Sequence, residues 1–170
     1  MESVLNNKGE WKKGLTSIVI LTYNQLEYTK KCIDSIRKFT DKNSYEIIAV
    51  DNHSTDGTAQ WLQEQVDLKV AYNNENLGFP KGCNQGIEVS SGDSILLLNN
   101  DTLVTKNWLI NLRECLFSNE NIGAVGPVTN NCDHYQRIQT SYKNIEEMHS
   151  FSEQYNVSNV EKWYESIMLI

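Results

Sequence analysis

The side chains of this 170-residue chain that are best suited to chemistry directly follow short apolar runs. Four such polar segments occur in order: 22–24, 51–57, 73–78 and 99–101. Divalent metals such as Mg²⁺ and Mn²⁺ prefer oxygen ligands and typically bridge one or two carboxylates to substrate phosphates. The last segment holds one carboxylate, Asp101, beside the amides of Asn99 and Asn100. We expect Asp101 to bind a metal, and an N-cap or turn role is the alternative.

Asp51 differs from the other turn residues because it ends an apolar run several positions before the next helix. A carboxylate there can accept a hydrogen bond from a pyrimidine imide N–H or a ribose hydroxyl, so we expect it to contact a ligand. Ser, Thr, Asp and Gly residues commonly form turns and caps, which is the favoured interpretation of 54–57. His53 and His134 have no partner at metal-ligand spacing and are interpreted as ordinary solvated or capping residues.

Three glycines, Gly78, Gly82 and Gly86, recur at every fourth position. Glycine permits either close approach of a backbone to a ligand or tight packing of a helix on a sheet. The spacing fits neither the dinucleotide GxGxxG pattern nor the GxxxxGK[ST] phosphate loop. Both interpretations therefore remain open at this level.

The elements that position these residues alternate between apolar runs and helical patterns. We expect strands at 17–21, 46–50, 68–72, 94–98 and 122–125, and helices at 24–39, 58–66, 79–89, 106–117 and 144–155. Asn24 with Glu27 fits a capping box at the start of the first helix. The alternation predicts an α/β fold with a mainly parallel central sheet flanked by helices. Ligands bind beyond the carboxyl ends of such strands, where the four polar segments would converge.

Composition excludes several classes of protein. The net charge of −7 argues against a nucleic-acid partner, which requires clustered positive charge. The four cysteines form no CxxC pair and are expected to be buried free thiols in a reducing compartment. The polar N-terminus lacks the pattern of a signal peptide, and the run 95–98 is too short to span a membrane. We therefore expect a cytoplasmic chain without a transmembrane segment.

Taken together, the motifs resemble the family 2 glycosyltransferases of the GT-A fold, particularly the rhamnosyltransferase-like members. The resemblance covers about residues 16 to 130 and rests on four motifs in order: 19–24, 50–58, 74–79 with Gly82, Asn84 and Gly86, and 97–101. It implies a Rossmann-like, nucleotide-diphospho-sugar transferase architecture. It also implies a nucleotide-diphosphate-sugar donor, a divalent metal (Mg²⁺ or Mn²⁺) and transfer with inversion.

The resemblance also implies roles for individual residues. Thr22, Tyr23 and Asn24 would touch the nucleotide, and Asp51 would contact its base. The ribose and diphosphate would be lined by Asn76, Gly78 and Asn84. The segment Asn99, Asn100 and Asp101 stands where the family has its Asp-x-Asp motif, with Asp101 at the metal-binding last position. Asn99 in place of the first aspartate removes one negative charge, which puts tight metal binding in doubt.

The expected organisation is an N-terminal extension (1–15), a nucleotide-sugar-binding domain (16–130) and the start of an acceptor-side region that is cut short (131–170). The acceptor would be a glycan or a lipid-linked molecule of a cell-envelope polysaccharide, with peripheral membrane association of a full-length protein. No catalytic base is assigned, because no acidic residue before Ile170 matches the family's base motif; Glu161 and Glu165 are interpreted as solvated helix residues. We therefore expect little or no transferase activity from this chain alone.

Two other functions are considered. The first is a non-catalytic nucleotide-binding or regulatory module of the same fold. The second is a nucleotidyltransferase, which the absence of a glycine-rich, basic loop after the first strand disfavours.

Overall fold

The computed structural model describes residues 12–131 and 136–163, and the chain divides into two compact units, residues 1–104 and 105–170. The division falls inside the segment 16–130 that was expected as one domain, and the first strand already begins at Lys12.

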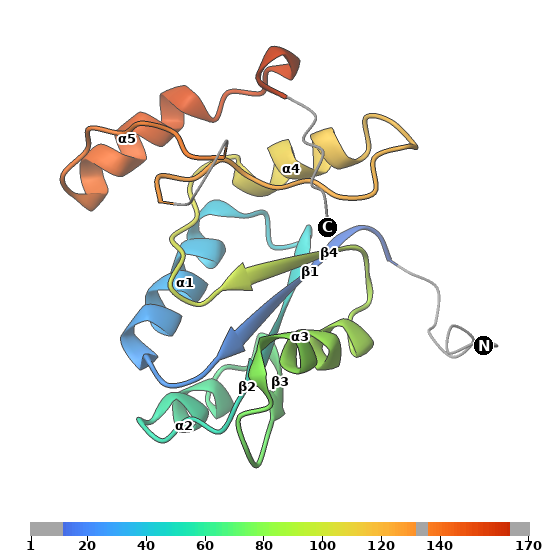
Figure 1. Ribbon diagram of the computed structural model, residues 1–170, viewed down its shortest axis with the longest axis vertical. Coiled ribbons are helices and arrows are strands. Elements are labelled where there is room, and N and C mark those ends of the chain that lie inside the picture. The colour runs from blue at the N-terminus through green and yellow to red at the C-terminus, as the bar shows by residue number, and fades with distance from the viewer. Residues whose placement is uncertain (1–11, 132–135, 164–170) are drawn as a thin grey trace. The chain divides into compact units, whose positions relative to one another are not determined.

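The first unit is built on a parallel sheet of four strands in the order β3-β2-β1-β4 (Figure 1). The strands are β1 (Lys12–Thr22), β2 (Tyr45–Asp51), β3 (Leu68–Tyr72) and β4 (Gly92–Asn99). Every pairing between them is parallel, which confirms the predicted α/β class. The central position of β1 and β2 explains their apolar sequences, since strands covered on both faces contact no water.

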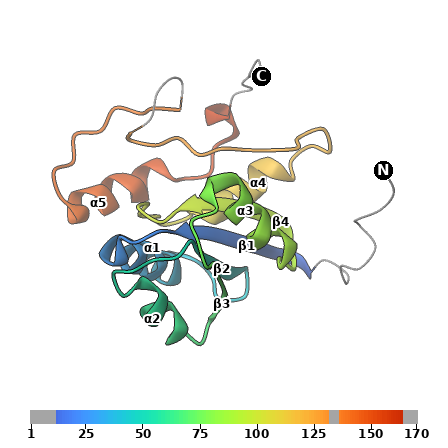
Figure 2. The same cartoon turned by 60° about the horizontal axis from the view of Figure 1, so that its bottom comes forward.

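Helices cover both faces of this sheet, with α3 (Gly78–Glu88) on one face and α1 (Leu26–Phe39) and α2 (Thr58–Gln63) on the other (Figure 2). Alternate residues of β1 and β2 therefore enter two separate apolar layers. The layer under α3 contains Val19, Ile48 and Val50, together with the partly buried Leu21 and Ala71.

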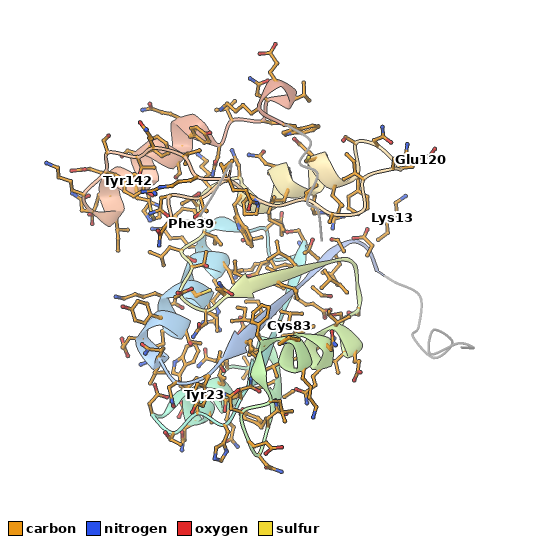
Figure 3. All side chains as sticks on the ribbon, in the orientation of Figure 1. Lys13, Tyr23, Phe39, Cys83, Glu120 and Tyr142 are labelled. Carbon is orange, nitrogen blue, oxygen red and sulfur yellow. The ribbon has the colours of Figure 1, made fainter. Side chains whose placement is uncertain are left out.

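The glycines of α3 serve close packing on the sheet. A Cβ atom at Gly82 would overlap the side chain of Leu21, and one at Gly86 would overlap Val19. Both glycines are buried, and so is Cys83 beside them (Figure 3). Of the two interpretations left open by the sequence, helix packing is therefore the one that applies to Gly82 and Gly86.

The first helix begins later than predicted, and the expected capping box is wrong. Asn24 and Gln25 both adopt positive φ angles, 57° and 65°, and α1 starts at Leu26 without a side-chain cap. The amide oxygen of Asn24 instead accepts the backbone N–H of Thr55 at 2.8 Å. The side chain that the sequence predicted to cap the helix therefore makes a tertiary hydrogen bond instead.

The second unit contains α4 (Trp108–Leu116), α5 (Ile145–Tyr155) and a short 3₁₀ helix, η1 (Val160–Lys162). The predicted acidic helix is confirmed: the side chain of Asn144 caps α5 by accepting the backbone N–H of Glu147 at 2.9 Å. The predicted fifth strand is wrong, because residues 122–125 form no strand pairing. No helix in the described ranges is long and apolar enough to cross a bilayer.

Candidate functional site

The strand ends that carry the polar segments lie at one edge of the sheet. Thr22 is in register with Asp51, and Asp51 is in register with Tyr72. On the other side of β1, Leu21 is paired with Asn99, the last residue of β4. The register therefore brings together the segments that begin at Thr22, Asp51, Asn73 and Asn99.

Asp51 lies at the centre of this edge and is only 2% exposed. One carboxylate oxygen accepts the hydroxyl of Thr22 at 2.9 Å, and the other accepts the backbone N–H of Ser54 at 2.9 Å. Thr22 is fully buried. Each carboxylate oxygen has capacity for a further hydrogen bond, so the group can hold the loop and still accept a donor from a ligand.

The loops that follow β1 and β2 are joined by reciprocal hydrogen bonds. The backbone N–H of Asn24 donates to the Ser54 hydroxyl at 2.7 Å, and that of Leu26 donates to Asp56 at 3.0 Å. Burial opposes ionisation of Asp56, but hydrogen bonds from Thr58 and from the Leu26 backbone lower the pKa of this carboxyl below its usual value. These bonds fix the start of α1 against the loop before α2.

Tyr23, directly after β1, is 52% exposed (Figure 3). Tyr72 at the end of β3 is exposed to a similar degree, 49%. Partial burial and the negative charge of Asp51 both raise the pKa of Tyr72. Tyr72, the register partner of Asp51, and Tyr23, the residue directly after β1, thus place two exposed aromatic residues at the edge of the sheet that carries this carboxylate.

A network of amide side chains occupies the loop after β3. Asn52 is 1% exposed; its amide nitrogen donates to the side-chain oxygen of Asn76 (3.2 Å) and to the carbonyl of Gly78 (3.3 Å). Its amide oxygen accepts from Asn73 at 2.8 Å, and Asn73 exchanges two hydrogen bonds of 2.9 Å with Gln85 on α3.

Asn52, Asn73 and Gln85 were not among the predicted site residues. The available signal was an amide residue directly after β2 (Asn52) and after β3 (Asn73), because amides both donate and accept in a buried network.

The residues expected at the diphosphate lie around the start of α3. Asn76 uses its side-chain oxygen twice, accepting Asn52 and the backbone N–H of Gly78 at 2.9 Å. Gly78 opens α3 with a positive φ of 76°, a conformation that favours glycine. Asn84 is exposed on α3. The side chain of Asn76 is therefore engaged within its own loop, whereas Asn84 faces solvent.

At the end of β4, Asn99 and Asp101 are exposed and Asn100 is half-buried. The side chain of Asn100 donates to the Thr29 hydroxyl at 3.0 Å, which ties this turn to α1. The thiol of Cys32 contacts the Asn99 carbonyl at 3.6 Å; burial raises the pKa of that thiol to about 12, with a smaller upward effect from Asp101. Asn100 thus has a structural contact.

Asp101 has the geometry of a carboxylate available to a cation. Its side chain makes no hydrogen bond or ion pair with any residue that the structure describes. Within those same ranges, no group of three or more His, Cys, Asp or Glu side chains is placed to hold a metal ion. A single free carboxylate suits a metal that is also held by substrate phosphates and water, but not a site formed by protein alone.

The remaining candidates have no shared site. His53 is exposed in the loop after β2 with a positive φ of 70°, and Glu161 is exposed in η1. His134 and Glu165 lie outside the described residues.

Comparison with known proteins identifies the family. The family model "Glycosyl transferase family 2" matches residues 17–166, nearly the whole chain. The chain belongs to the family 2 glycosyltransferases. The match extends beyond the segment 16–130 on which the sequence resemblance rested, and it confirms that resemblance.

Individual relatives support this assignment. Glycosyltransferase AglE of Haloferax volcanii is 34% identical over 98 residues, covering 55% of this chain and 32% of the relative. The poly(ribitol-phosphate) beta-glucosyltransferase of Bacillus spizizenii is 34% identical over 113 residues, covering 62% of this chain and 17% of the relative. The crystal structure of Staphylococcus aureus TarS matches with a TM-score of 0.55 and 27% identity, covering 61% of this chain and 32% of that one. The fold is GT-A, and the match spans a third or less of each relative.

Proposed function

We propose that this chain forms the donor-binding part of a metal-assisted, inverting glycosyltransferase. Its donor is a nucleotide-diphosphate sugar, and its acceptor is a glycan or lipid-linked molecule of the cell envelope. The observation that carries the proposal is the register of the sheet, in which Thr22, Asp51 and Tyr72 align and Asn99 ends the adjoining strand. Ligands of open parallel sheets bind beyond such aligned carboxyl ends.

For the nucleoside, we propose that the exposed ring of Tyr23 and the carboxylate of Asp51 contact the base. An aromatic ring offers a stacking surface, and a carboxylate accepts an imide N–H. Thr22 and Asn24 support this contact through hydrogen bonds within the protein. The Thr22 hydroxyl donates to Asp51, and Asn24 bonds to the Ser54 hydroxyl and to the Thr55 backbone N–H. The roles of these two residues are therefore to orient the loops.

For the diphosphate, we propose that Gly78 and the exposed Asn84 line the site, with Asn76 shaping the loop that leads into α3. Backbone N–H groups at the start of a helix favour anions, and α3 begins at Gly78. Asp101 would hold a Mg²⁺ or Mn²⁺ ion, with Asn99 beside it. A bound divalent ion neutralises the charge that develops on the departing nucleoside diphosphate. The chain's own contribution is a single charged ligand on a turn that Asn100 fastens to α1.

Calorimetry tests the donor proposal directly. UDP, GDP and dTDP are each titrated into the 170-residue chain with Mn²⁺ present. We expect heat of binding from at least one of them. Absence of heat from all three, with protein shown by circular dichroism to be folded, would overturn the proposal.

One observation favours the alternative of a non-catalytic nucleotide-binding module: the amide Asn99 stands where the family motif has its first carboxylate. Nucleotide release from a panel of nucleotide sugars separates the two functions. A transferase donor site is expected to hydrolyse its donor slowly to free sugar even without acceptor. Tight nucleoside diphosphate binding with no release from any donor would support the module.

A further inference from the structure

We infer that Asn52 is a positioning residue that holds the loop 73–78 and the start of α3 in the conformation that binds the donor diphosphate. This inference rests on the proposed function, because it concerns the same site. Asn52 need not touch the donor for this role. It acts through the segment that it fastens.

The hydrogen bonds of Asn52 all lead to one segment of the chain. Its amide nitrogen donates to the Asn76 side chain and the Gly78 carbonyl, and its amide oxygen accepts from Asn73. A single side chain at the end of β2 therefore fixes both ends of a loop that begins 21 positions further on. Asn73 extends the connection to Gln85, about two turns into α3.

The loop itself has little packing that would define its conformation. Asn74, Glu75 and Asn76 are exposed, Gly78 is exposed, and Leu77 is the half-buried apolar residue between them. A segment without apolar burial depends on its polar contacts for order. Asn52 supplies these contacts and is itself only 1% exposed. It directly follows β2, whose residues from Ile47 to Asp51 are buried, so its position is fixed by the core of the sheet.

The chemistry of an amide is required at this position. The Gly78 carbonyl only accepts, so the group facing it must donate. Rotating the Asn76 amide could present a donor to a carboxylate at position 52, but the Asn76 oxygen would then leave the Gly78 N–H that it now accepts at 2.9 Å. An ionised carboxylate in place of the Asn52 amide would thus face an acceptor it cannot bond. A protonated carboxylic acid could still donate.

Asn52→Asp tests this inference through its pH profile. Burial beside acceptor oxygens raises the pKa of a carboxyl, so the variant should change from a protonated, donating form to a repelling one between about pH 5 and about pH 9. We expect UDP affinity, with Mn²⁺, to be within about twofold of wild type at the acid end and about tenfold weaker at the alkaline end. Affinity parallel to wild type across the whole range, in a folded variant, would overturn the inference.

Asn74→Asp is the matched control for the added negative charge. Asn74 is exposed in the same loop and makes no hydrogen bond with the described residues. It reports the direct effect of a carboxylate near the diphosphate, together with titration of the nucleotide itself. The inference requires the profile of Asn52→Asp to exceed that of Asn74→Asp, and equal profiles count against it.

A second variant and a second measurement cover the case in which Asn52→Asp does not fold. Asn76→Ala removes, at an exposed position, the side-chain oxygen that accepts from Asn52 and from the Gly78 N–H. We expect about a tenfold loss of UDP affinity with an unchanged melting temperature. Hydrogen exchange of the ligand-free chain should show faster exchange of the 74–78 amides in both variants. This readout needs no ligand, so it separates failure of the positioning role from failure of nucleotide binding. Unchanged exchange in both would overturn the inference.

Discussion

The hydroxyl of Thr22 donates a 2.9 Å hydrogen bond to Asp51, its register partner across β1 and β2. Both side chains are buried, at 0% and 2% exposure. The carboxylate proposed to read the base therefore also joins the two central strands at their ends and holds the Ser54 backbone. Binding and stability are expected to change together when it is altered.

Asp51→Ala is expected to lower the free energy of unfolding by about 2–3 kcal/mol, because the buried Thr22 hydroxyl and the partly buried Ser54 N–H lose their acceptor. Nucleoside diphosphate affinity should fall as well. Urea unfolding and calorimetry measure the two effects separately. Thr22→Val is the matched comparison: it removes the shared hydrogen bond but keeps the carboxylate, so it should cost about 1 kcal/mol of stability and less affinity than Asp51→Ala. Loss of stability without loss of affinity in Asp51→Ala would leave Asp51 a purely structural role.

Asp101→Asn should leave stability unchanged, because the side chain is exposed and has no bond to the described part of the chain. The variant should lose the increase in nucleotide affinity that Mn²⁺ gives the wild type. Titrations with Mn²⁺ and with EDTA measure that increase. Glu75→Gln, which removes an exposed charge from the loop after β3, is expected to retain it. Retention of the Mn²⁺ effect in Asp101→Asn would assign Asp101 a turn role.

Asn99→Asp restores the carboxylate that the family motif has at its first position. Asn99 is exposed at the end of β4, so the change should be tolerated by the fold. A second negative charge near the cation should tighten Mn²⁺ binding by about 1 kcal/mol, or about fivefold. Mn²⁺ titration in the presence of UDP measures it, and no gain in affinity would place the ion away from this turn.

We expect Glu46, near the amino end of β2, to make part of the protein's stability sensitive to acid. Burial disfavours its charge, yet hydrogen bonds from Lys69, Ser17 and Ser91 lower the pKa of Glu46 from 4.5 to about 2. Because the pKa of Glu46 is lower in the folded state than in the unfolded chain, its ionised form stabilises the fold fully at pH values above about 4.5. This stabilisation is lost as the pH falls from about 4.5 towards about 2. It amounts to about 2 kcal/mol after allowance for the half-exposed Lys69.

Glu46→Gln should remove this component. Urea unfolding at several pH values is expected to show a smaller decline between about pH 5 and about pH 2 than in wild type. Glu88→Gln, at an exposed position on α3, should follow the wild-type curve. An equal decline in all three proteins would assign the acid sensitivity to other groups.

The sequence by itself determined the first unit's strands, their parallel arrangement and the edge at which polar segments gather. These follow from local patterns: runs such as 17–21 are apolar because both faces of the strand are covered, and the helices between them show the 3.6-residue period. The failed prediction at 122–125 has the same origin. Four apolar or small residues fit a strand locally, but a strand exists only with a pairing partner, which local sequence does not specify.

The tertiary structure decided how the site residues are used. Asn24 does not cap α1, because its side chain accepts the backbone N–H of Thr55. Gly82 and Gly86 pack against Leu21 and Val19 of the sheet. Asn52 became the centre of an amide network, and its direct hydrogen-bond partners lie 21 to 26 positions further along the chain. Hydrogen-bond partners so distant in sequence meet only after the sheet has formed. The residue types therefore identified the chemistry available at this edge, whereas folding selected which groups face a ligand and which hold the loops in place.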